Sequence, residues 1–364
     1  MIGQYYAMNH LWADVWNGNE IINESLLFAP DPKTGKTLPC RLLCAPDTIF
    51  RVCSPDGNVD YVPDLDYTVQ DGCIVRLPES RMPYFQMDEY YLKDPASISI
   101  ESVFCPGRYV RFEDAGREVH RRQVLISYHH SDESPIARPE SALSKLPQTR
   151  ERLQAKKPIH IRFYGDSFME GRDSSGMSGL MPYLPPIDRL TALLLSDLWQ
   201  HPSIRISNYA VGGTVSRWGA EEAKKNLGTE APDLVLIRFG MNDGGGVSPS
   251  EFKENTRKMI EIGREANPNM EFLLISTEVP NPDCKGWTGL QREYEPVLRE
   301  LAEEMPGCGF FSMGRVFDIA MQRKGYASIT ANMVNHPNDF MIRLYASSFA
   351  YALYEGSDRK EQSK

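Results

Sequence analysis

Polar side chains that could perform acyl transfer follow the predicted strands of the second half of the chain. They form four groups in chain order: Gly165–Ser167, Asn208–Thr214, Gly240–Asp243 and His336–Pro337. A serine hydroxyl is a weak nucleophile and needs an adjacent base. Ser167 lies between a strand and the following loop, where its Oγ can be exposed. Ser167 is therefore the candidate nucleophile, and a histidine is the expected base.

Three of the seven histidines lie in this half of the chain. His160 is inside a predicted strand, and His201 precedes a strand and so lies at the wrong edge of the sheet. His336 remains as the candidate base. The negative charge that develops during acyl transfer needs two or three hydrogen-bond donors. The Ser167 and Gly213 N–H groups and the Asn242 side-chain amide could supply them.

These residues are positioned by an alternation of strands and helices. Strands are predicted over 159–164, 204–209, 234–239, 272–276 and 309–312, and helices over 187–199, from 249 to about 266, over 288–304 and over 337–353. Such alternation predicts a parallel sheet with right-handed crossovers. Sites in such sheets lie beyond the carboxyl ends of the strands, where the four polar groups fall.

The N-terminal part has a different pattern. Residues 1–130 contain short β-rich runs separated by turns, including a hairpin around Gln70-Asp71-Gly72. They predict an accessory β-sandwich domain. Residues 131–157 are rich in Pro, Ser and charge and predict a linker with a helical turn near its end. The α/β domain then covers 158–356, and a polar tail covers 357–364.

The four polar groups resemble the sequence blocks of the SGNH, or GDSL, hydrolase superfamily. Gly165-Asp166-Ser167 matches the GDS block, Asn208 and Gly213 match the second block, in which Ala210 replaces the middle glycine, and Gly240–Asp243 matches GxND. His336-Pro337 matches the last block. The resemblance covers about residues 158–356. It implies a flavodoxin-like three-layer α/β/α domain with a parallel five-stranded sheet, no metal or other cofactor, and ester hydrolysis through an acyl-serine intermediate.

By this resemblance, Ser167 is the nucleophile and first oxyanion donor, Gly213 and Asn242 are the other donors, and His336 is the base. One departure concerns the aspartate that usually precedes the histidine by three residues, because Met333 occupies that position. A backbone carbonyl could orient His336 instead. Asn332, Asp339 or an acid from elsewhere could also do so, or no acid is used.

Residues 171–186 follow the candidate nucleophile as a long loop rich in Gly, Pro and Met. This loop is predicted to form a flexible rim that shapes the substrate pocket. Trp218 and Trp287 are predicted to flank it, where they could stack on a sugar ring or serve as packing anchors.

Composition limits the other classes of function. The chain has 364 residues, of which 41% are hydrophobic, and a net charge of −9. Its pI is about 5.4 and its mean hydropathy −0.42. An acidic chain without a long apolar run is a poor candidate for binding nucleic acid or membranes. Seven cysteines, an odd number, and an N-terminus unlike a signal peptide predict reduced thiols and a cytoplasmic location. Cys40 and Cys44 are spaced CRLLC, which does not predict a metal site.

The leading hypothesis is a serine esterase that hydrolyses small acyl esters, acetyl above all, of a carbohydrate. The alternatives are an acyltransferase, a short-chain lipase or a thioesterase acting at the same residues. A catalytically weak binding module is a further alternative because of Met333. The expected partner is a small-molecule or saccharide ester, and the chain could form a homo-oligomer.

Overall fold

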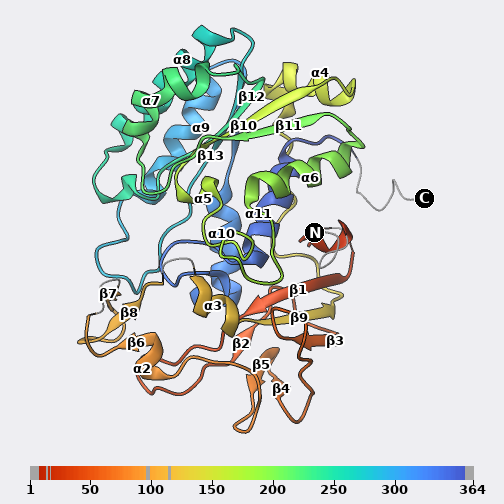
Figure 1. Cartoon of the computed structure of the whole chain (residues 1–364), viewed down its shortest axis with the longest axis vertical. Coiled ribbons are helices and arrows are strands. Elements are labelled where there is room, and N and C mark those ends of the chain that lie inside the picture. Colours follow the sequence, from red (N-terminus) through yellow and green to blue (C-terminus); the bar gives the residue numbers. More distant parts are fainter. Residues whose placement is uncertain (1–7, 14, 17, 96–98, 114–115, 357–364) are drawn as a thin grey trace.

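A computed structural model describes residues 8–13, 15–16, 18–95, 99–113 and 116–356 (Figure 1). The predicted polar tail at 357–364 lies outside the described residues.

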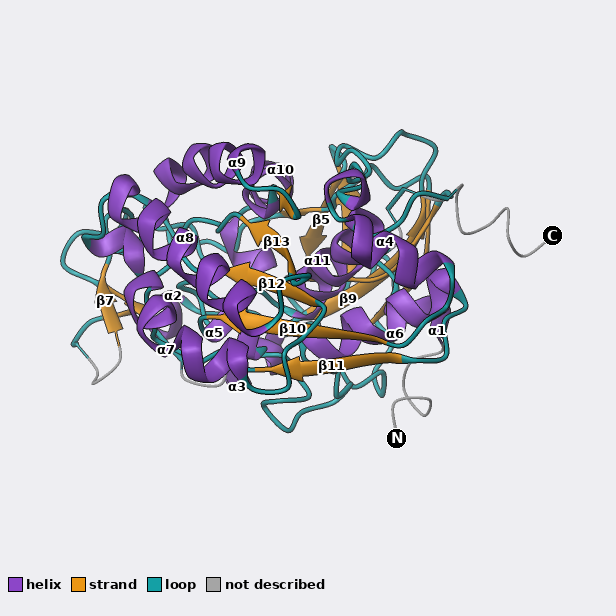
Figure 2. Cartoon of the chain, turned by 90° about the horizontal axis from the view of Figure 1, so that it is seen from above, coloured by secondary structure: helices purple, strands orange, loops and turns teal. Residues whose placement is uncertain are grey.

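A five-stranded parallel sheet organises the second half of the chain, as predicted. Its strands are β10 (Ile159–Gly165), β11 (Ile204–Asn208), β12 (Leu234–Arg238), β13 (Glu271–Ile275) and β14 (Cys308–Phe311). Their order in the sheet is β11-β10-β12-β13-β14. This is the flavodoxin-like order, with the switch point between β10 and β12. Figure 2 shows the strands side by side with helices around them.

Both faces of the sheet are covered, because successive side chains of a strand point to opposite faces. Phe163, Leu236 and Leu273 belong to one buried cluster and Val235 and Leu274 to another. On the first face lie α5 (Ser167–Glu170), α6 (Ile187–Trp199), α10 (Met313–Lys324) and α11 (Asp339–Ala352). On the second lie α7 (Ser216–Gly228), α8 (Pro249–Ala266) and α9 (Tyr294–Glu304). The three layers match the predicted fold class (Figure 1).

Helices α6 and α8 have the predicted bounds. Helix α11 begins two residues later and ends one residue earlier than predicted, and α9 begins six residues later than predicted. The sequence does not predict α7 and α10. Helix α7 is rich in charged residues and contains Gly219, so its apolar face is short. Helix α10 begins two residues after β14 ends, without a loop that would separate it from the strand. Short 3-10 helices are η3 (Leu143–Lys145), η4 (Asp243–Gly245), η5 (Gln291–Glu293) and η6 (Tyr326–Ile329).

The described residues of the N-terminal part form three small antiparallel sheets. The first contains β1 (Glu20–Leu26), β9 (Val124–His129) and β3 (Thr48–Cys53); the second β2 (Cys40–Arg41), β5 (Cys73–Arg76) and β4 (Tyr67–Gln70); the third β6 (Tyr91–Leu92), β8 (Tyr109–Arg111) and β7 (Ser99–Glu101). Short helices α1 (Met8–Leu11), α2 (Met87–Tyr90) and α3 (Arg117–Arg122) accompany them. The predicted β4–β5 hairpin is confirmed, with Gln70 opposite Cys73. The sandwich arrangement stays a prediction.

The segment predicted as a linker is folded onto the α/β domain. Helix α4 (Pro147–Gln154) lies near its end, as the predicted helical turn does, but is longer. Leu143, Leu146 and Leu153 are buried. The domain boundaries themselves stay a prediction.

The N-terminal sheets and the α/β domain share one core. Leu26 and Ile126 of the first sheet belong to the same buried cluster as Phe163 of β10. In Figure 1, α10 and α11 lie between this sheet and the parallel sheet. The shared core makes the N-terminal part a structural support of the α/β domain rather than an independent attachment.

Buried polar contacts cross the same boundary. Lys324, at the end of α10, forms a fully buried ion pair with Glu24 of β1. The Glu24 carboxylate also accepts from Leu43 N–H at 2.8 Å and from the Tyr128 hydroxyl at 2.7 Å. Arg343 of α11 donates to two carbonyl oxygens of β1, each at 2.8 Å. These contacts fix β1 against α10 and α11.

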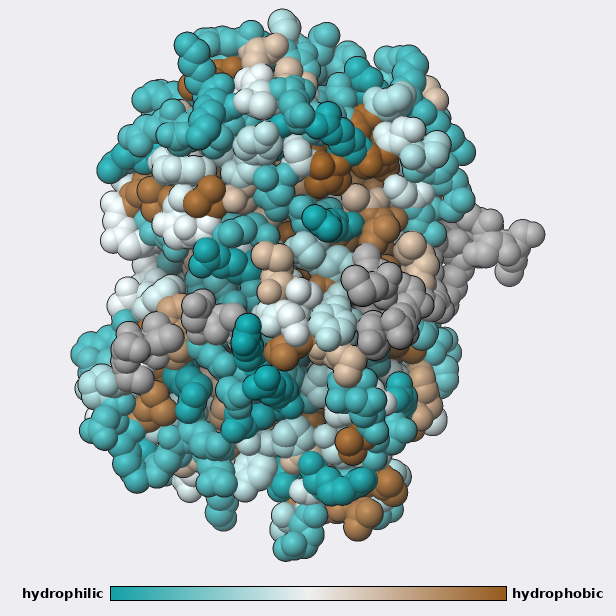
Figure 3. All heavy atoms as spheres, in the orientation of Figure 1, coloured by the Kyte–Doolittle hydropathy of each residue, from teal (hydrophilic) through white to brown (hydrophobic). Residues whose placement is uncertain are grey.

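All seven cysteines are free, and all but Cys73 are buried, which agrees with the predicted reduced thiols. In the described part of the chain, every helix is too short or too polar to cross a membrane. On the face shown in Figure 3, hydrophilic residues predominate and hydrophobic ones occur in small groups.

We expect Lys324→Met to lower the free energy of unfolding by about 3–5 kcal/mol, because it leaves the Glu24 carboxylate buried without its cation. Urea unfolding measures this. Lys225→Met, at an exposed position, is the control and should change stability by less than about 0.5 kcal/mol. Equal stability of the two variants would contradict the role given to the ion pair.

Candidate active site

The candidate nucleophile begins a short helix directly after the first strand of the parallel sheet. Strand β10 ends at Gly165, and Asp166 is the N-cap of α5, with its carboxylate accepting from Phe168 N–H at 3.1 Å. Ser167 is the first residue of α5. The N–H groups of a first helical turn have no acceptor within the helix. The Ser167 N–H therefore has no acceptor within α5, and its role as an oxyanion donor stays a prediction.

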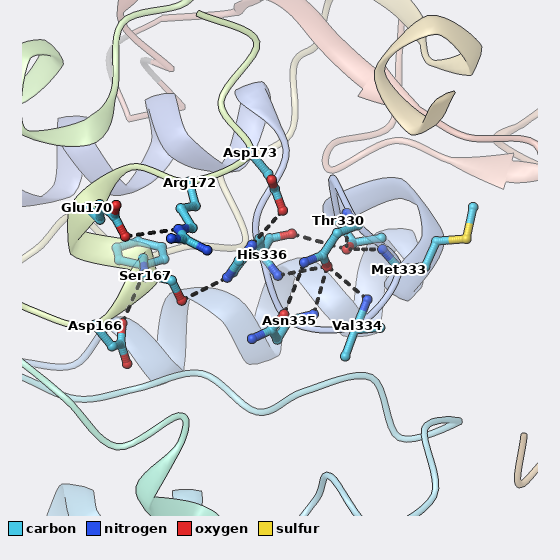
Figure 4. A network of polar contacts seen from close by, with 12 residues as sticks. Asp166, Ser167, Glu170, Arg172, Asp173, Thr330, Met333, Val334, Asn335 and His336 are labelled. Carbon is cyan, nitrogen blue, oxygen red and sulfur yellow. Dashed lines mark hydrogen bonds and ion pairs between the residues drawn. The ribbon is translucent and has the colours of Figure 1, made fainter. Parts of the chain in front are cut away.

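Ser167, His336 and Asp173 form a continuous set of hydrogen bonds (Figure 4). The Ser167 hydroxyl lies 2.8 Å from His336 Nε2, and His336 Nδ1 lies 2.5 Å from Asp173 Oδ2. Because an ionised carboxylate only accepts hydrogen bonds, Nδ1 carries the proton and donates to Asp173. Nε2 is then left to accept the proton of Ser167. Their exposed fractions are 6% for Ser167, 8% for His336 and 7% for Asp173.

The residue that contacts His336 Nδ1 is none of those named from the sequence. Neither a backbone carbonyl, Asn332 nor Asp339 occupies that position. Asn332 accepts from the N–H groups of residues 334, 335 and 336 at 3.0–3.1 Å and so shapes the histidine loop. Asp339 accepts from Ser175 N–H at 2.9 Å and so holds the loop that carries Asp173. The open alternative of an acid from elsewhere is the one that matches the geometry.

Met333 replaces the usual aspartate, and its side chain points away from His336 (Figure 4). It is fully buried in a cluster with Val334 and residues of the N-terminal part. Its backbone has φ of 67°, a left-handed conformation that is uncommon for a residue other than glycine. The side chain at this position is therefore used for packing.

A signal for Asp173 is present in the sequence. The loop 171–186 follows Ser167 directly, and Asp173 is the one carboxylate in it. With Met333 in the acid's usual place, Asp173 is thus a carboxylate close in sequence to the nucleophile. What the sequence does not show is the turn at Asp173, where φ is 61°.

The second and third polar groups meet beside the nucleophile segment. Val211 N–H donates to Gly165 O at 3.0 Å, and the Asn208 side chain donates to Met169 O at 2.7 Å. The Asn242 amide donates to Thr214 O at 2.9 Å. Gly213, between these contacts, has φ of 79°, which favours glycine. The structure thus brings the loops of Ser167, Gly213 and Asn242 to one edge of the sheet.

Two aspartates of the motifs, Asp166 and Asp243, brace these loops by accepting hydrogen bonds from backbone N–H groups. Asp166 does so for α5, and Asp243 accepts from Ser216 N–H at 2.8 Å and from Gly240 N–H at 3.0 Å. Burial raises the pKa of the Asp243 carboxyl above its usual value. The carboxylates of both aspartates are engaged in loop structure and not in the Ser–His–Asp set.

A buried cation lies beneath the nucleophile segment. Arg238, at the end of β12, forms ion pairs with Asp166 and with Glu278, all three fully or almost fully buried. Burial raises the pKa of the Glu278 carboxyl, and the Arg238 guanidinium acts against that rise. The sequence does not predict this cluster, which joins the ends of three strands below Ser167.

The rim of the site combines charged and apolar side chains. Glu170 and Arg172 form an ion pair at 3.0 Å, and a Cβ at Gly212 would lie 2.8 Å from both. The pair therefore lies against Gly212, which precedes Gly213 in the chain. Figure 4 shows the ion pair itself. Met177, Tyr183 and Val211 are exposed. The substrate-pocket rim over residues 171–186 stays a prediction.

The two tryptophans predicted beside the rim are partly buried. Trp287 packs edge-on against Phe112 with ring centroids 5.8 Å apart. Trp218 packs against Tyr164 at 5.9 Å. Both rings are engaged in packing, so of the two interpretations, the anchor role is the one these contacts favour. Among the described residues, no group of three or more His, Cys, Asp or Glu side chains is placed to hold a metal ion.

The strand order and the Ser–His–Asp set at the carboxyl edge define a flavodoxin-like α/β domain with the side chains of a serine hydrolase. Residues 163–341 match the sequence profile of the GDSL-like Lipase/Acylhydrolase family, and this part of the chain belongs to that family.

The chain is similar to an arylesterase of Vibrio mimicus, with 30% identity over 121 residues. That match covers 32% of this chain and 60% of the relative's length. A two-domain esterase (CEX) active on acetylated mannans has a TM-score of 0.45 and 23% identity, covering 60% of this chain and 57% of that one. Axe2, an acetylxylan esterase from Geobacillus stearothermophilus, has a TM-score of 0.45 and 19% identity, covering 54% and 95%.

We expect Asp173→Asn to lower kcat for 4-nitrophenyl acetate by about 10³- to 10⁴-fold, because the amide favours the wrong histidine tautomer. Asp339→Asn is the matched control, since it keeps a carbonyl oxygen for Ser175 N–H. Stopped-flow kinetics on both variants test this. A larger loss in the Asp339 variant than in the Asp173 variant would contradict the assignment of Asp173.

Proposed function

We propose that the protein is a carboxylic ester hydrolase that acts through an acyl-serine intermediate. The observation that carries this proposal is the hydrogen-bonded set in which His336 lies between the Ser167 hydroxyl and the Asp173 carboxylate. Ser167 Oγ attacks the ester carbonyl while His336 Nε2 takes its proton. Asp173 stabilises the imidazolium that forms. His336 then gives the proton to the leaving alcohol, and water repeats the sequence to release the acid.

The oxyanion of each tetrahedral intermediate is bound by three donors in this proposal. They are the N–H groups of Ser167 and Gly213 and the side-chain amide of Asn242. The hydrogen bonds that tie their loops together support it, because preorganised donors need no rearrangement during the reaction.

The substrate in this proposal is a small acyl ester, acetyl above all, of a carbohydrate. Ser167 and His336 are almost buried, which favours a short acyl group over a long chain. The Glu170–Arg172 pair at the rim offers one carboxylate and several N–H donors to sugar hydroxyls. The similarity to an arylesterase supports ester chemistry and does not bear on the sugar.

The hypothesis of a catalytically weak binding module depended on the missing aspartate at Met333. Asp173 supplies a carboxylate at His336 Nδ1, which removes that motive. A homo-oligomeric state, a cytoplasmic location and the absence of nucleic-acid partners stay predictions from the sequence.

Ser167→Ala is expected to lower kcat by about 10⁴-fold or more for every ester that the wild type hydrolyses. The panel includes acetylated xylo- and manno-oligosaccharides and 4-nitrophenyl esters from acetate to palmitate, with acid release followed by titration. Turnover that survives in the Ser167 variant would contradict the mechanism. A preference for palmitate over acetate would contradict only the proposal that the acyl group is small.

Arg172→Ala is expected to raise KM for an acetylated oligosaccharide about tenfold, because a charged hydrogen bond to a hydroxyl is lost. KM for 4-nitrophenyl acetate, which has no sugar hydroxyls, should not change. Arg205→Ala, which removes an exposed arginine paired with Glu230, is the control. Equal changes in KM for both substrates would contradict a role of Arg172 in binding the alcohol.

A further inference from the structure

Helix α3 of the N-terminal part contacts two loops of the candidate site, the one that carries Asp173 and the one that carries His336. It contains six residues, Arg117–Arg122, and precedes β9. In the sequence it lies about fifty residues before Asp173 and more than two hundred before His336.

The first contact is made by His120. Its Nε2 lies 2.6 Å from the backbone oxygen of Asp173, and its side chain is 3% exposed. A carbonyl oxygen only accepts hydrogen bonds, so Nε2 carries a proton and donates it. The N-terminal part thus holds the backbone of the residue whose carboxylate contacts His336.

The second contact is with the histidine loop. Val119 of α3 belongs to the same buried cluster as Met333 and Val334. A Cβ at Gly116 would lie 2.5 Å from Ala331 O, and the residue has φ of 59°. Glycine at 116 therefore allows the start of α3 to approach this loop closely.

The loop that carries Asp173 depends on such contacts. It is a Gly-rich connection, and Asp173 has a left-handed backbone that costs free energy in a residue other than glycine. The left-handed backbone of Asp173 therefore needs contacts from neighbouring groups that stabilise it. His120 and the bond from Ser175 N–H to Asp339 are two such groups, one on each side of residue 174.

We propose that His120 is a positioning residue of the active site. Its Nε2–H fixes the Asp173 backbone, which keeps the Asp173 carboxylate on His336 Nδ1. The N-terminal part is then required for catalysis through a specific hydrogen bond, in addition to its shared core. This proposal rests on the proposed function, because it assigns His120 a role in activating Ser167.

The test compares His120→Gln with His120→Leu. Glutamine has an Nε2–H at about the same reach, whereas leucine fills space and donates nothing. His120→Leu is expected to lower kcat for 4-nitrophenyl acetate by about 10²-fold with little change in KM. The reason is that a displacement of the Asp173 carboxylate by about 1 Å is enough to lower the rate by that factor. His120→Gln should stay within about threefold of the wild type, since the donor is retained.

A spectroscopic readout separates positioning from general support. The short hydrogen bond from His336 Nδ1 to Asp173 should give a far-downfield proton resonance, assigned by its loss in Asp173→Asn. We expect this resonance in the wild type and in His120→Gln, and its loss in His120→Leu. Melting temperatures check that each variant is folded, and His120→Met, also without a donor, replaces the leucine variant if that one does not fold.

Two results would overturn the proposal. One is a folded variant without the donor that keeps wild-type kcat and the resonance. The other is an equal loss of kcat in the glutamine and leucine variants. Both leave the proposed function intact, which fails by a different result, namely unchanged ester turnover in Ser167→Ala.

Discussion

The hydrogen bond from His336 Nδ1 to Asp173 is the interaction on which the candidate site depends. It determines which nitrogen of His336 faces Ser167, and so whether the hydroxyl meets a proton acceptor. The two residues lie on separate loops, Asp173 after α5 and His336 between η6 and α11. Their approach must therefore be determined by what packs around the loops, which includes Asn332, Asp339 and helix α3.

This arrangement places the nucleophile and the acid in one segment. Asp173 follows Ser167 by six residues, whereas the aspartate of the usual motif precedes the histidine by three. With Met333 turned into the core, the histidine loop contributes the base alone. Because Asp173 lies in a long loop, buried contacts from outside that loop must hold its carboxylate in place. The ion pair of Glu24 and Lys324 and the bonds of Arg343 serve this need indirectly, because they fix the N-terminal sheets against α10 and α11.

Much of the α/β domain can be predicted from the sequence, because its strands are buried apolar runs followed by polar residues. That pattern alone predicts that Ser167, Gly213, Asn242 and His336 lie at one edge of the sheet. The structure confirms the contact between Ser167 and His336. The roles of the four residues stay proposals.

The features that the sequence does not predict depend on long-range contacts, which a local sequence pattern does not encode. Asp173 reaches His336 because of a left-handed turn, and Arg238 is charged although it ends a buried strand. Helix α7 is held by packing rather than by a long apolar face. Residues 143–154 look polar, yet their leucines are buried against the α/β domain. In each case, tertiary packing decides the outcome over local composition.

The rate of phosphonylation by a serine-directed fluorophosphonate measures whether Asp173 and His336 activate Ser167, as we propose. Intact mass would follow one adduct with time in the wild type, Ser167→Ala and Asp173→Asn. We expect one adduct on the wild type, none on the Ser167 variant, and labelling slowed by about 10³-fold in the Asp173 variant. Labelling of Asp173→Asn at the wild-type rate would contradict this proposal.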